Sequence, residues 1–313
     1  MEGSIISRIR VFLKRRAFAI GGLAVSVPLI VIILLQYQAL TTLNKTLPAY
    51  RKQLMRQYLM SVVGDFTKFY RDNAERALAV PLGAIDLPKS GVIMDDDESK
   101  TSEKAVTSVA EHFKKQDFKG AKRFFIAVAT EHEGVEGSEV FFYDPVSQSM
   151  VRDNEAMEMV AIKVACASYM VYIRKGSELI PGAQSVDRDP RARMLVRPIL
   201  DEWKKVMAVA GMTLDYEYFL DTVLPGAIRK ALPEFLPSED QDPITSLYFR
   251  SDFHIAYDRK GNRLELSEGE RRVEAEAYQP LISVFSNSSL SVRLKNLTAE
   301  QLARRNFLIN LSL

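Results

Sequence analysis

One long block of this sequence contains no charged residue: it runs from Ala17 to Asn44 and covers 28 residues. Its first part, Ala17 to Leu35, is almost entirely apolar. Nineteen helical residues at about 1.5 Å per residue approach the ~30 Å thickness of the hydrocarbon core of a bilayer. A cleaved signal peptide is the alternative, but its apolar region spans only about 7–15 residues and ends at a small-residue cleavage site. We therefore expect an uncleaved transmembrane helix over residues 17–38.

The charges that flank this block predict its orientation. Five cations crowd the N-terminal side and four follow on the other side: Arg8, Arg10, Lys14, Arg15 and Arg16, then Lys45, Arg51, Lys52 and Arg56. Because positive charge next to a membrane helix favours the cytoplasmic side, residues 1–16 are interpreted as a cytoplasmic basic tip. The chain is then a single-pass protein of the inner (cytoplasmic) membrane, with an extracytoplasmic or periplasmic domain over residues 45–300.

The overall charge and the rare residue types exclude several classes of function. The 42 Lys and Arg against 40 Asp and Glu give a net charge of +2, without the excess that is typical of nucleic-acid binders. One cysteine excludes an internal disulfide framework, and three histidines leave little material for a histidine metal site. We expect no cofactor, no metal and no nucleic-acid partner.

A long amphipathic helix is predicted over residues 48–78. Its apolar residues recur at spacings of three and four: Leu54, Tyr58, Val62, Phe66, Phe69, Tyr70, Ala74 and Ala77. Pro81 and Gly83 follow and end the pattern. The stripe can pack on its own domain, which we favour for most of it, or it can pair with a second copy and make a homodimer.

The remaining pattern alternates strands that pair locally with helices between them. Strands are expected at 123–130, 139–143, 149–152, 193–200, 205–214, 247–257, 262–266 and 290–295, and helices at 101–118, 153–175 and 216–232. The 153–175 helix is expected to bury Met157, Val160, Ala161, Val164, Ala167 and Val171. Such an order predicts an α+β fold around an antiparallel sheet, with a core over about residues 101–296.

The chain ends on eight uncharged residues after Arg304 and Arg305. Residues 304–313 read as the start of a possible second transmembrane helix, although they are too short to cross a bilayer. A short amphipathic terminal helix that begins near Thr298 is the alternative.

Two stretches carry a resemblance to a known family. In the first, from Leu195 to Pro225, a strand is followed by a Tyr-Phe-containing helix and a Leu-Pro pair; its motif residues are Val209, Ala210, Gly211, Leu214, Asp215, Tyr218, Phe219, Leu224 and Pro225. With the anchor and the long helix, it resembles the extracytoplasmic sensor region of bacterial membrane-bound sensor histidine kinases. The second, Phe253 to Arg263, is similar to the hairpin with a D-x-x-G turn in Cache and PAS-like sensors. The resemblance implies a PAS/Cache-like antiparallel sheet flanked by helices.

The resemblance also implies a function in two-component signal transduction. The chain would be a membrane-anchored sensory module that detects an unknown small molecule or stimulus and relays it through membrane helices. The family's phosphoacceptor helix and Gly-rich ATP-binding domain have no counterpart here, because His112, His132 and His254 all lie in the expected extracytoplasmic part. We expect no enzymatic activity from this chain. The alternative is a membrane-tethered structural or interaction domain without a ligand site, which a filled core would favour.

A ligand site is hypothesised around two arginines. Arg193 and Arg197 fall on the same face of one strand, and such a pair can clamp a carboxylate bidentately. The competing interpretation is that both arginines pair with acidic neighbours at a sheet edge. Further candidates are two tyrosines of the preceding helix and two residues at the strand exit: Tyr169, Tyr172, Asp215 and Tyr216.

Overall fold

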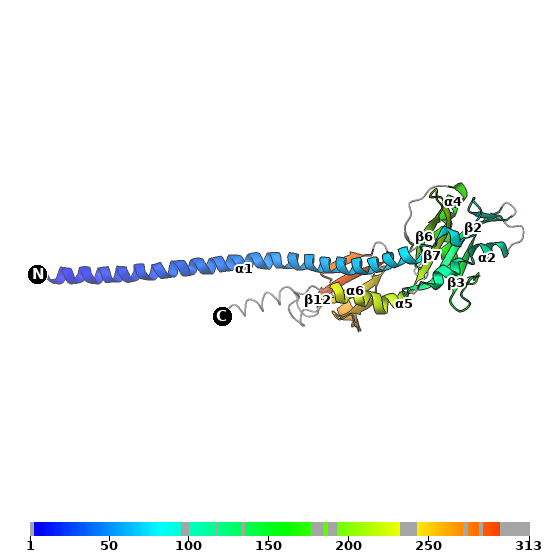
Figure 1. Cartoon of the computed structure of the whole chain (residues 1–313). Coiled ribbons are helices and arrows are strands. Elements are labelled where there is room, and N and C mark those ends of the chain that lie inside the picture. Colours follow the sequence, from blue (N-terminus) through cyan, green and yellow to red (C-terminus); the bar gives the residue numbers. More distant parts are fainter. Residues whose placement is uncertain are drawn as a thin grey trace. The chain divides into compact units, whose positions relative to one another are not determined.

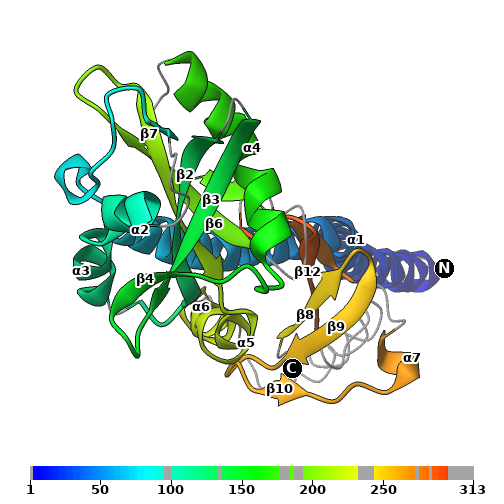
Figure 2. The ribbon, with the colours of Figure 1, turned by 90° about the vertical axis from the view of Figure 1, so that its right-hand side faces the viewer.

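The computed structural model describes residues 3–94, 100–116, 118–132, 135–176, 184–186, 193–231, 243–271, 275–281 and 284–294. The chain divides into a first unit that includes residues up to Leu54 and a second unit, Met55–Asn296. The second unit contains two sheets, which are antiparallel apart from one parallel strand pair, and the helices that pack on them (Figures 1 and 2). This confirms the predicted mixture of helices with antiparallel sheet.

Helix α1 covers Gly3–Ala77. It includes both helices expected from the sequence, and it ends one residue before the expected end at Leu78. Among the residues that the structure describes, no helix is long and apolar enough for a membrane crossing. The membrane helix over residues 17–38 therefore stays a prediction, and residues 304–313 lie outside the described residues.

The first sheet has seven strands. Six of them follow the order β4-β3-β2-β7-β6-β5, and β1 pairs with β2 in parallel. Their bounds are Val92–Met94 (β1), Ala121–His132 (β2), Val135–Asp144 (β3), Ser149–Arg152 (β4), Gln184–Val186 (β5), Met194–Leu200 (β6) and Val206–Leu214 (β7). Every residue of β7 is buried, as its two apolar faces predict.

Helices cover the first sheet on both faces (Figure 2). Phe124 stacks on Phe113 of α3 (Val109–Lys114), which follows α2 (Lys100–Val106). The next residue, Phe125, points to the opposite face, where it joins a core with α4 (Met159–Lys175). Gly176 ends α4 in the left-handed conformation, with a φ of 56°.

The face that α4 buries differs from the expected one. The buried side chains are Met159, Ile162, Ala165, Cys166, Tyr169, Met170 and Ile173. Val160 and Val164, which the helical spacing assigned to the core, are 72% and 48% exposed. Because α4 is apolar on both sides, periodicity alone could not distinguish its two faces. Burial raises the pKa of the Cys166 thiol to about 12, so this cysteine is a core residue of the first sheet.

The second sheet has the strand order β10-β9-β8-β12-β11. Its strands are Pro243–Phe249 (β8), Asp252–Tyr257 (β9), Arg263–Leu264 (β10), Ala277–Pro280 (β11) and Ser288–Leu294 (β12). The single strand expected over 247–257 is wrong, because the chain reverses at Arg250 and Ser251. Both residues have positive φ, 49° and 79°, without the glycine that usually marks such a turn.

A three-part helical segment links the two sheets. It consists of α5 (Tyr216–Tyr218), the π-helical turn η2 (Phe219–Val223) and α6 (Leu224–Ala231). Asp215 caps its start by accepting a 3.0 Å hydrogen bond from the Tyr218 N–H. Pro225 lies in the first turn of α6. Proline has no backbone N–H to donate, and the π-helical turn just before α6 accommodates this.

The two motifs that carried the family resemblance are in contact. Asp258 accepts 2.8 Å hydrogen bonds from the backbone N–H groups of Lys260 and Asn262, which shapes the β9–β10 turn. Gly261 has a φ of 76°, and a Cβ atom there would lie 2.8 Å from the Pro225 carbonyl oxygen. The D-x-x-G turn therefore needs glycine both for its backbone and for its packing on α6.

The apolar stripe of α1 packs on its own unit, which is the alternative that we favoured. Tyr58, Val62, Phe66, Tyr70 and Ala74 are each at most 2% exposed. The Tyr58 and Thr245 hydroxyls share a buried 2.8 Å hydrogen bond that ties α1 to β8. Burial raises the pKa of both Tyr58 and Tyr70; the Tyr58 value rises to about 12 although its bond to Thr245 opposes the shift.

Removing each of these two hydroxyls is expected to have opposite effects. The Tyr58→Phe variant should lower the free energy of unfolding by about 1–2 kcal/mol, because the buried Thr245 hydroxyl loses its partner. The Tyr70 hydroxyl is buried and has no hydrogen-bond partner among the described residues, so Tyr70→Phe should leave stability unchanged or raise it by about 1 kcal/mol. Urea unfolding of both variants provides the comparison. An equal loss in the two would contradict the assigned partners.

Candidate functional site

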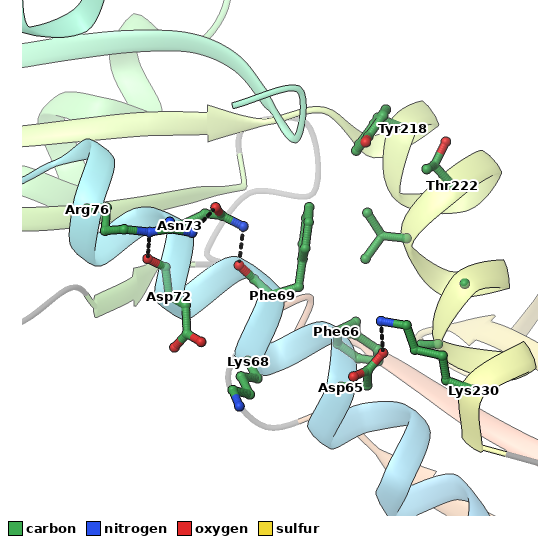
Figure 3. A pocket seen from close by; sticks show the side chains of 13 residues that line it. Asp65, Phe66, Lys68, Phe69, Asp72, Asn73, Arg76, Tyr218, Thr222 and Lys230 are labelled. Carbon is green, nitrogen blue, oxygen red and sulfur yellow. Dashed lines mark hydrogen bonds and ion pairs between the residues drawn. The ribbon is translucent and has the colours of Figure 1, made fainter. Parts of the chain in front are cut away.

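A cleft of about 420 Å³ opens between α1 and the η2–α6 segment (Figure 3). We refer to it as the α1–α6 cleft. One wall consists of Asp65, Phe66, Lys68, Phe69, Asp72, Asn73 and Arg76 of α1, and the other of Tyr218, Thr222, Val223, Gly226, Ala227 and Lys230. Its volume lies within the ~300–1,000 Å³ range of small-molecule sites.

An ion pair crosses one end of this cleft. Lys230 Nζ lies 3.2 Å from Asp65 Oδ2, so the pair joins α6 to α1 (Figure 3). Their side chains are 74% and 39% exposed, and an exposed pair contributes at most about 1 kcal/mol. A competing anion or cation can therefore replace either partner at low cost.

The other end of the cleft holds an arginine in a fixed orientation. Arg76 donates from Nη2 to Asn73 Oδ1 at 2.8 Å and from Nε to the Asp72 carbonyl oxygen at 3.1 Å. Asn73 in turn donates from Nδ2 to the Phe69 carbonyl oxygen at 2.7 Å. These bonds engage Nε and Nη2 on one side of the Arg76 guanidinium group, and a carboxylate can approach the N–H groups on its remaining side.

The lining combines charged ends with an apolar middle. Lys68, Arg76 and Lys230 contribute positive charge, and Asp65 and Asp72 contribute negative charge. Phe66, Phe69, Val223 and Ala227 contribute apolar surface. A lining of this kind suits a small molecule that carries a carboxylate, with or without an ammonium group.

The η2–α6 wall is attached to the second sheet. The Tyr257 hydroxyl donates a 2.9 Å hydrogen bond to the Leu220 carbonyl oxygen. Arg263 pairs with the Asp221 carboxylate. With the contact between Gly261 and Pro225, these bonds join the wall to β9 and β10.

The opposite wall, α1, is attached to the first sheet at its C-terminal end. Arg197 Nη1 of β6 lies 3.1 Å from Glu75 Oε2, and the same group donates to the Glu75 carbonyl oxygen. His112 Nε2 donates to the Ala77 carbonyl oxygen at 2.9 Å. Helix α1 therefore lines the cleft and contacts both sheets.

Comparisons with known proteins give similarities of low score. No protein-family model matches the chain, and no curated protein sequence is significantly similar to it. The sensory domain of the Campylobacter jejuni chemoreceptor Tlp3 (CcmL) with isoleucine bound aligns with a TM-score of 0.35 and 11% identity, over 82% of this chain and 95% of that domain. The periplasmic sensory domain of the Campylobacter jejuni chemoreceptor Tlp1 aligns with a TM-score of 0.27 and 11% identity, over 67% and 68%.

The predicted arginine pair is separated in the structure. Arg197 forms an ion pair with Glu75. The competing interpretation given above expected an acidic partner of this kind for both arginines. Arg193 is only 5% exposed, and its guanidinium carbon lies 4.5 Å from the ring centre of Tyr216, with Phe285 and Phe249 at 5.1 and 5.3 Å. Three aromatic faces enclose this cation and join the start of β6 to the second sheet.

The other four predicted site residues lie in different parts of the second unit. Asp215 is the helix cap described above, and Tyr216 is the nearest of the three rings around Arg193. Tyr169 is buried in the core beneath α4, whereas Tyr172 is 38% exposed on the same helix. Of the six candidates, the structure brings Arg193 and Tyr216 into contact, and none of the six lines the α1–α6 cleft.

One pattern in the sequence could have pointed to the cleft residues that were not predicted. Lys68, Asp72 and Arg76 recur at every fourth position of the long helix, which places alternating charges on one face. Such a pattern is usually a solvated face, and Lys230 lies more than 150 residues away in the sequence. Its position opposite Asp65 depends on how α6 packs.

Proposed function

We propose that this chain is an extracytoplasmic sensory module in which a small molecule with a carboxylate binds the α1–α6 cleft and displaces α1. One observation carries the proposal: α1 forms a wall of the cleft and also contacts both sheets. A ligand that changes the width of the cleft must move α1, η2–α6 or both. Both walls are bonded to the sheets, and we assign the movement to α1 because it is the wall that continues into the predicted membrane segment.

The charges of the cleft suggest how binding would act. The ligand carboxylate would be held by Arg76, because a guanidinium group favours a carboxylate, and Lys68, about two turns earlier on α1, would add positive charge to the cleft. An ammonium group on the ligand would face Asp72. A longer ligand would also reach Lys230 and replace its ion pair with Asp65, which releases the direct link between α6 and α1.

The proposal includes attachment to the membrane through the first part of α1. The sequence there has 28 uncharged residues, and its side chains include exposed apolar ones: Val31 is 47%, Ile32 54% and Leu35 59% exposed. With a cytoplasmic N-terminus, α1 would carry the displacement to the inner membrane. A two-component receptor of the histidine-kinase class would use such a signal; the phosphotransfer itself is not assigned to this chain.

A structural or interaction domain without a ligand remains the second candidate. The observation that favours it is the filled core of the first sheet, in which every residue of β7 is buried. Pairing of two copies through helix 48–78 stays a prediction from the sequence. However, the exposed face of that helix carries mostly polar and charged side chains, among them Lys52, Arg56 and Arg71.

Ligand binding can be measured by titrating the full chain in detergent micelles with single amino acids, dicarboxylates and, as a neutral comparison, glucose. We expect at least one carboxylate compound to bind and to raise the melting temperature. The Arg76→Gln variant should weaken that binding at least about 10-fold, because it removes a charge-assisted contact, and Lys68→Gln should weaken it less. Calorimetric titration gives the dissociation constants.

Arg56→Gln is the matched control, because Arg56 is also an exposed cation of α1 but does not line the cleft. Its affinity for the same compound should equal that of the unchanged chain. If Arg56→Gln weakens binding as much as Arg76→Gln does, the effect is a loss of general charge. If no compound of the panel binds, the domain without a ligand site is the better account.

A further inference from the structure

Helix α4 exposes a continuous apolar stripe on the side that faces away from its sheet. The exposed fractions are 83% for Met157, just before the helix, then 72% for Val160, 48% for Val164 and 46% for Val171. Ala167 is exposed as well and fills the position between Val164 and Val171. Soluble domains seldom leave such a stripe uncovered, so a patch of this kind indicates a contact surface.

The spacing of this stripe is that of a helix-pairing seam. The four residues within α4, Val160, Val164, Ala167 and Val171, follow one another at intervals of four, three and four, and Met157 precedes Val160 by three. These are the a and d positions of two heptads, the pattern by which one helix packs into the holes of another. The charged neighbours Lys163 and Lys175 lie beside the stripe and not within it. A helix that only covers a sheet needs its inward face to be apolar, so the sheet does not explain this second pattern.

We propose that a second copy of this chain packs against the outer face of α4 and that the two α4 helices form the core of a homodimer. The same surface on both copies satisfies the requirement of a twofold interface for self-complementarity. The heptad spacing favours a second helix of the same kind over a strand or a loop. This dimer is independent of the α1–α6 cleft, whose lining residues all lie on other elements.

The neighbouring residue Tyr172, 38% exposed, extends the apolar surface of the stripe. A specific dimer needs about 1,000 Å² of buried surface in total, about 500 Å² from each copy. The exposed face of α1 within the second unit offers a less continuous apolar surface than the stripe, since Met60, 56% exposed, stands among charged and polar neighbours.

A charge placed in the middle of the stripe tests the proposal. In the full chain in detergent micelles, sedimentation analysis should find a dimer, and Val164→Glu should weaken its association at least about 100-fold, because two carboxylates would face each other in an apolar seam. Val146→Glu is the matched control: Val146 is 91% exposed in the turn between β3 and β4, away from the stripe. Both variants should keep the circular dichroism spectrum of the unchanged chain.

Single cysteines distinguish a second copy from other occupants. Cysteine at Val164, in the middle of the stripe, should form disulfide-linked dimers on mild oxidation, whereas cysteine at Val146 should not, and the buried Cys166 thiol should stay unreactive in both. A monomer at all concentrations overturns the proposal, as does a dimer that Met60→Glu dissociates and Val164→Glu does not. A Val164→Cys thiol that resists maleimide in a monomer would indicate that the chain covers its own stripe, which also overturns it.

Discussion

Gly211→Ala is expected to lower the free energy of unfolding by about 3 kcal/mol, the upper end of the range for overpacking a core. Gly211 lies in the middle of β7, where it is paired with Phe125 of β2 and with Val196 of β6. A Cβ atom at Gly211 would lie 2.1 Å from the Phe125 Cζ atom and within 2.6 Å of two further ring carbons. The Phe125 ring therefore occupies the space that a side chain at position 211 would need.

The surroundings prevent this clash from being relieved. Phe125 is fully buried, and its ring lies in the core beneath α4, with Phe142 at a centroid distance of 6.3 Å. The backbone of β7 cannot shift away, because it is bonded to strands on both sides. Gly211, which belongs to the stretch that carries the resemblance, is thus a packing requirement of this sheet.

Two further variants test whether the clash with the Phe125 ring causes the loss of stability in Gly211→Ala. Gly64→Ala introduces the same methyl group in α1, where nothing lies within 4 Å, and should leave stability unchanged or raise it by up to about 1 kcal/mol. Combining Gly211→Ala with Phe125→Leu should recover part of the loss, with a coupling of about 1–2 kcal/mol. Urea unfolding followed by circular dichroism measures all of them. Additive losses in the double variant would show that the ring is not the cause.

The contrast between β6–β7 and β8–β9 explains how much of the fold the sequence could predict. The hairpin from Met194 to Leu214 was evident because two long apolar runs flank a short polar link, and Asp201 closes that link by accepting 2.8 Å hydrogen bonds from the Trp203 and Lys205 N–H groups. The turn at Arg250 and Ser251 was not evident, because neither residue type marks a positive φ. Helix α4 was predicted, but its buried face was not, since the sheet decides which of two apolar faces it covers.

The ligand hypothesis was limited in a similar way. Strand periodicity predicted one shared face for Arg193 and Arg197, but what each guanidinium contacts depends on residues far away in the sequence. Glu75 lies 122 residues before Arg197, and its hydrogen bond occupies the guanidinium that we expected to bind a ligand. Arg193 precedes β6 and is enclosed by rings from three elements. The burial and the contacts of these two guanidinium groups arise from tertiary packing and cannot be predicted from the spacing of residues in the sequence.

Phe219→Ala is expected to lower the free energy of unfolding by about 3–5 kcal/mol, the cost of truncating a fully buried aromatic ring. The Phe219 ring stacks on Phe285 with a centroid distance of 4.0 Å and meets Phe66 of α1 edge-on at 5.5 Å. Phe219 thus holds together α1, η2 and the turn before β12. Phe285 itself has a φ of 60°, a strained conformation for a bulky residue, which its packing against Phe219 helps to stabilise.

Loss of this ring should also affect function, because Phe66 lines the α1–α6 cleft and rests on it. Phe219→Leu keeps most of the volume and should cost less than about 1.5 kcal/mol, so that ligand binding can be measured in a folded chain. Phe253→Ala serves as a comparison, since Phe253 is half-buried on β9 and contacts Tyr248 instead of this cluster. If Phe253→Ala destabilises the chain as much as Phe219→Ala, the Phe66, Phe219 and Phe285 cluster is not the main link between α1 and the second sheet.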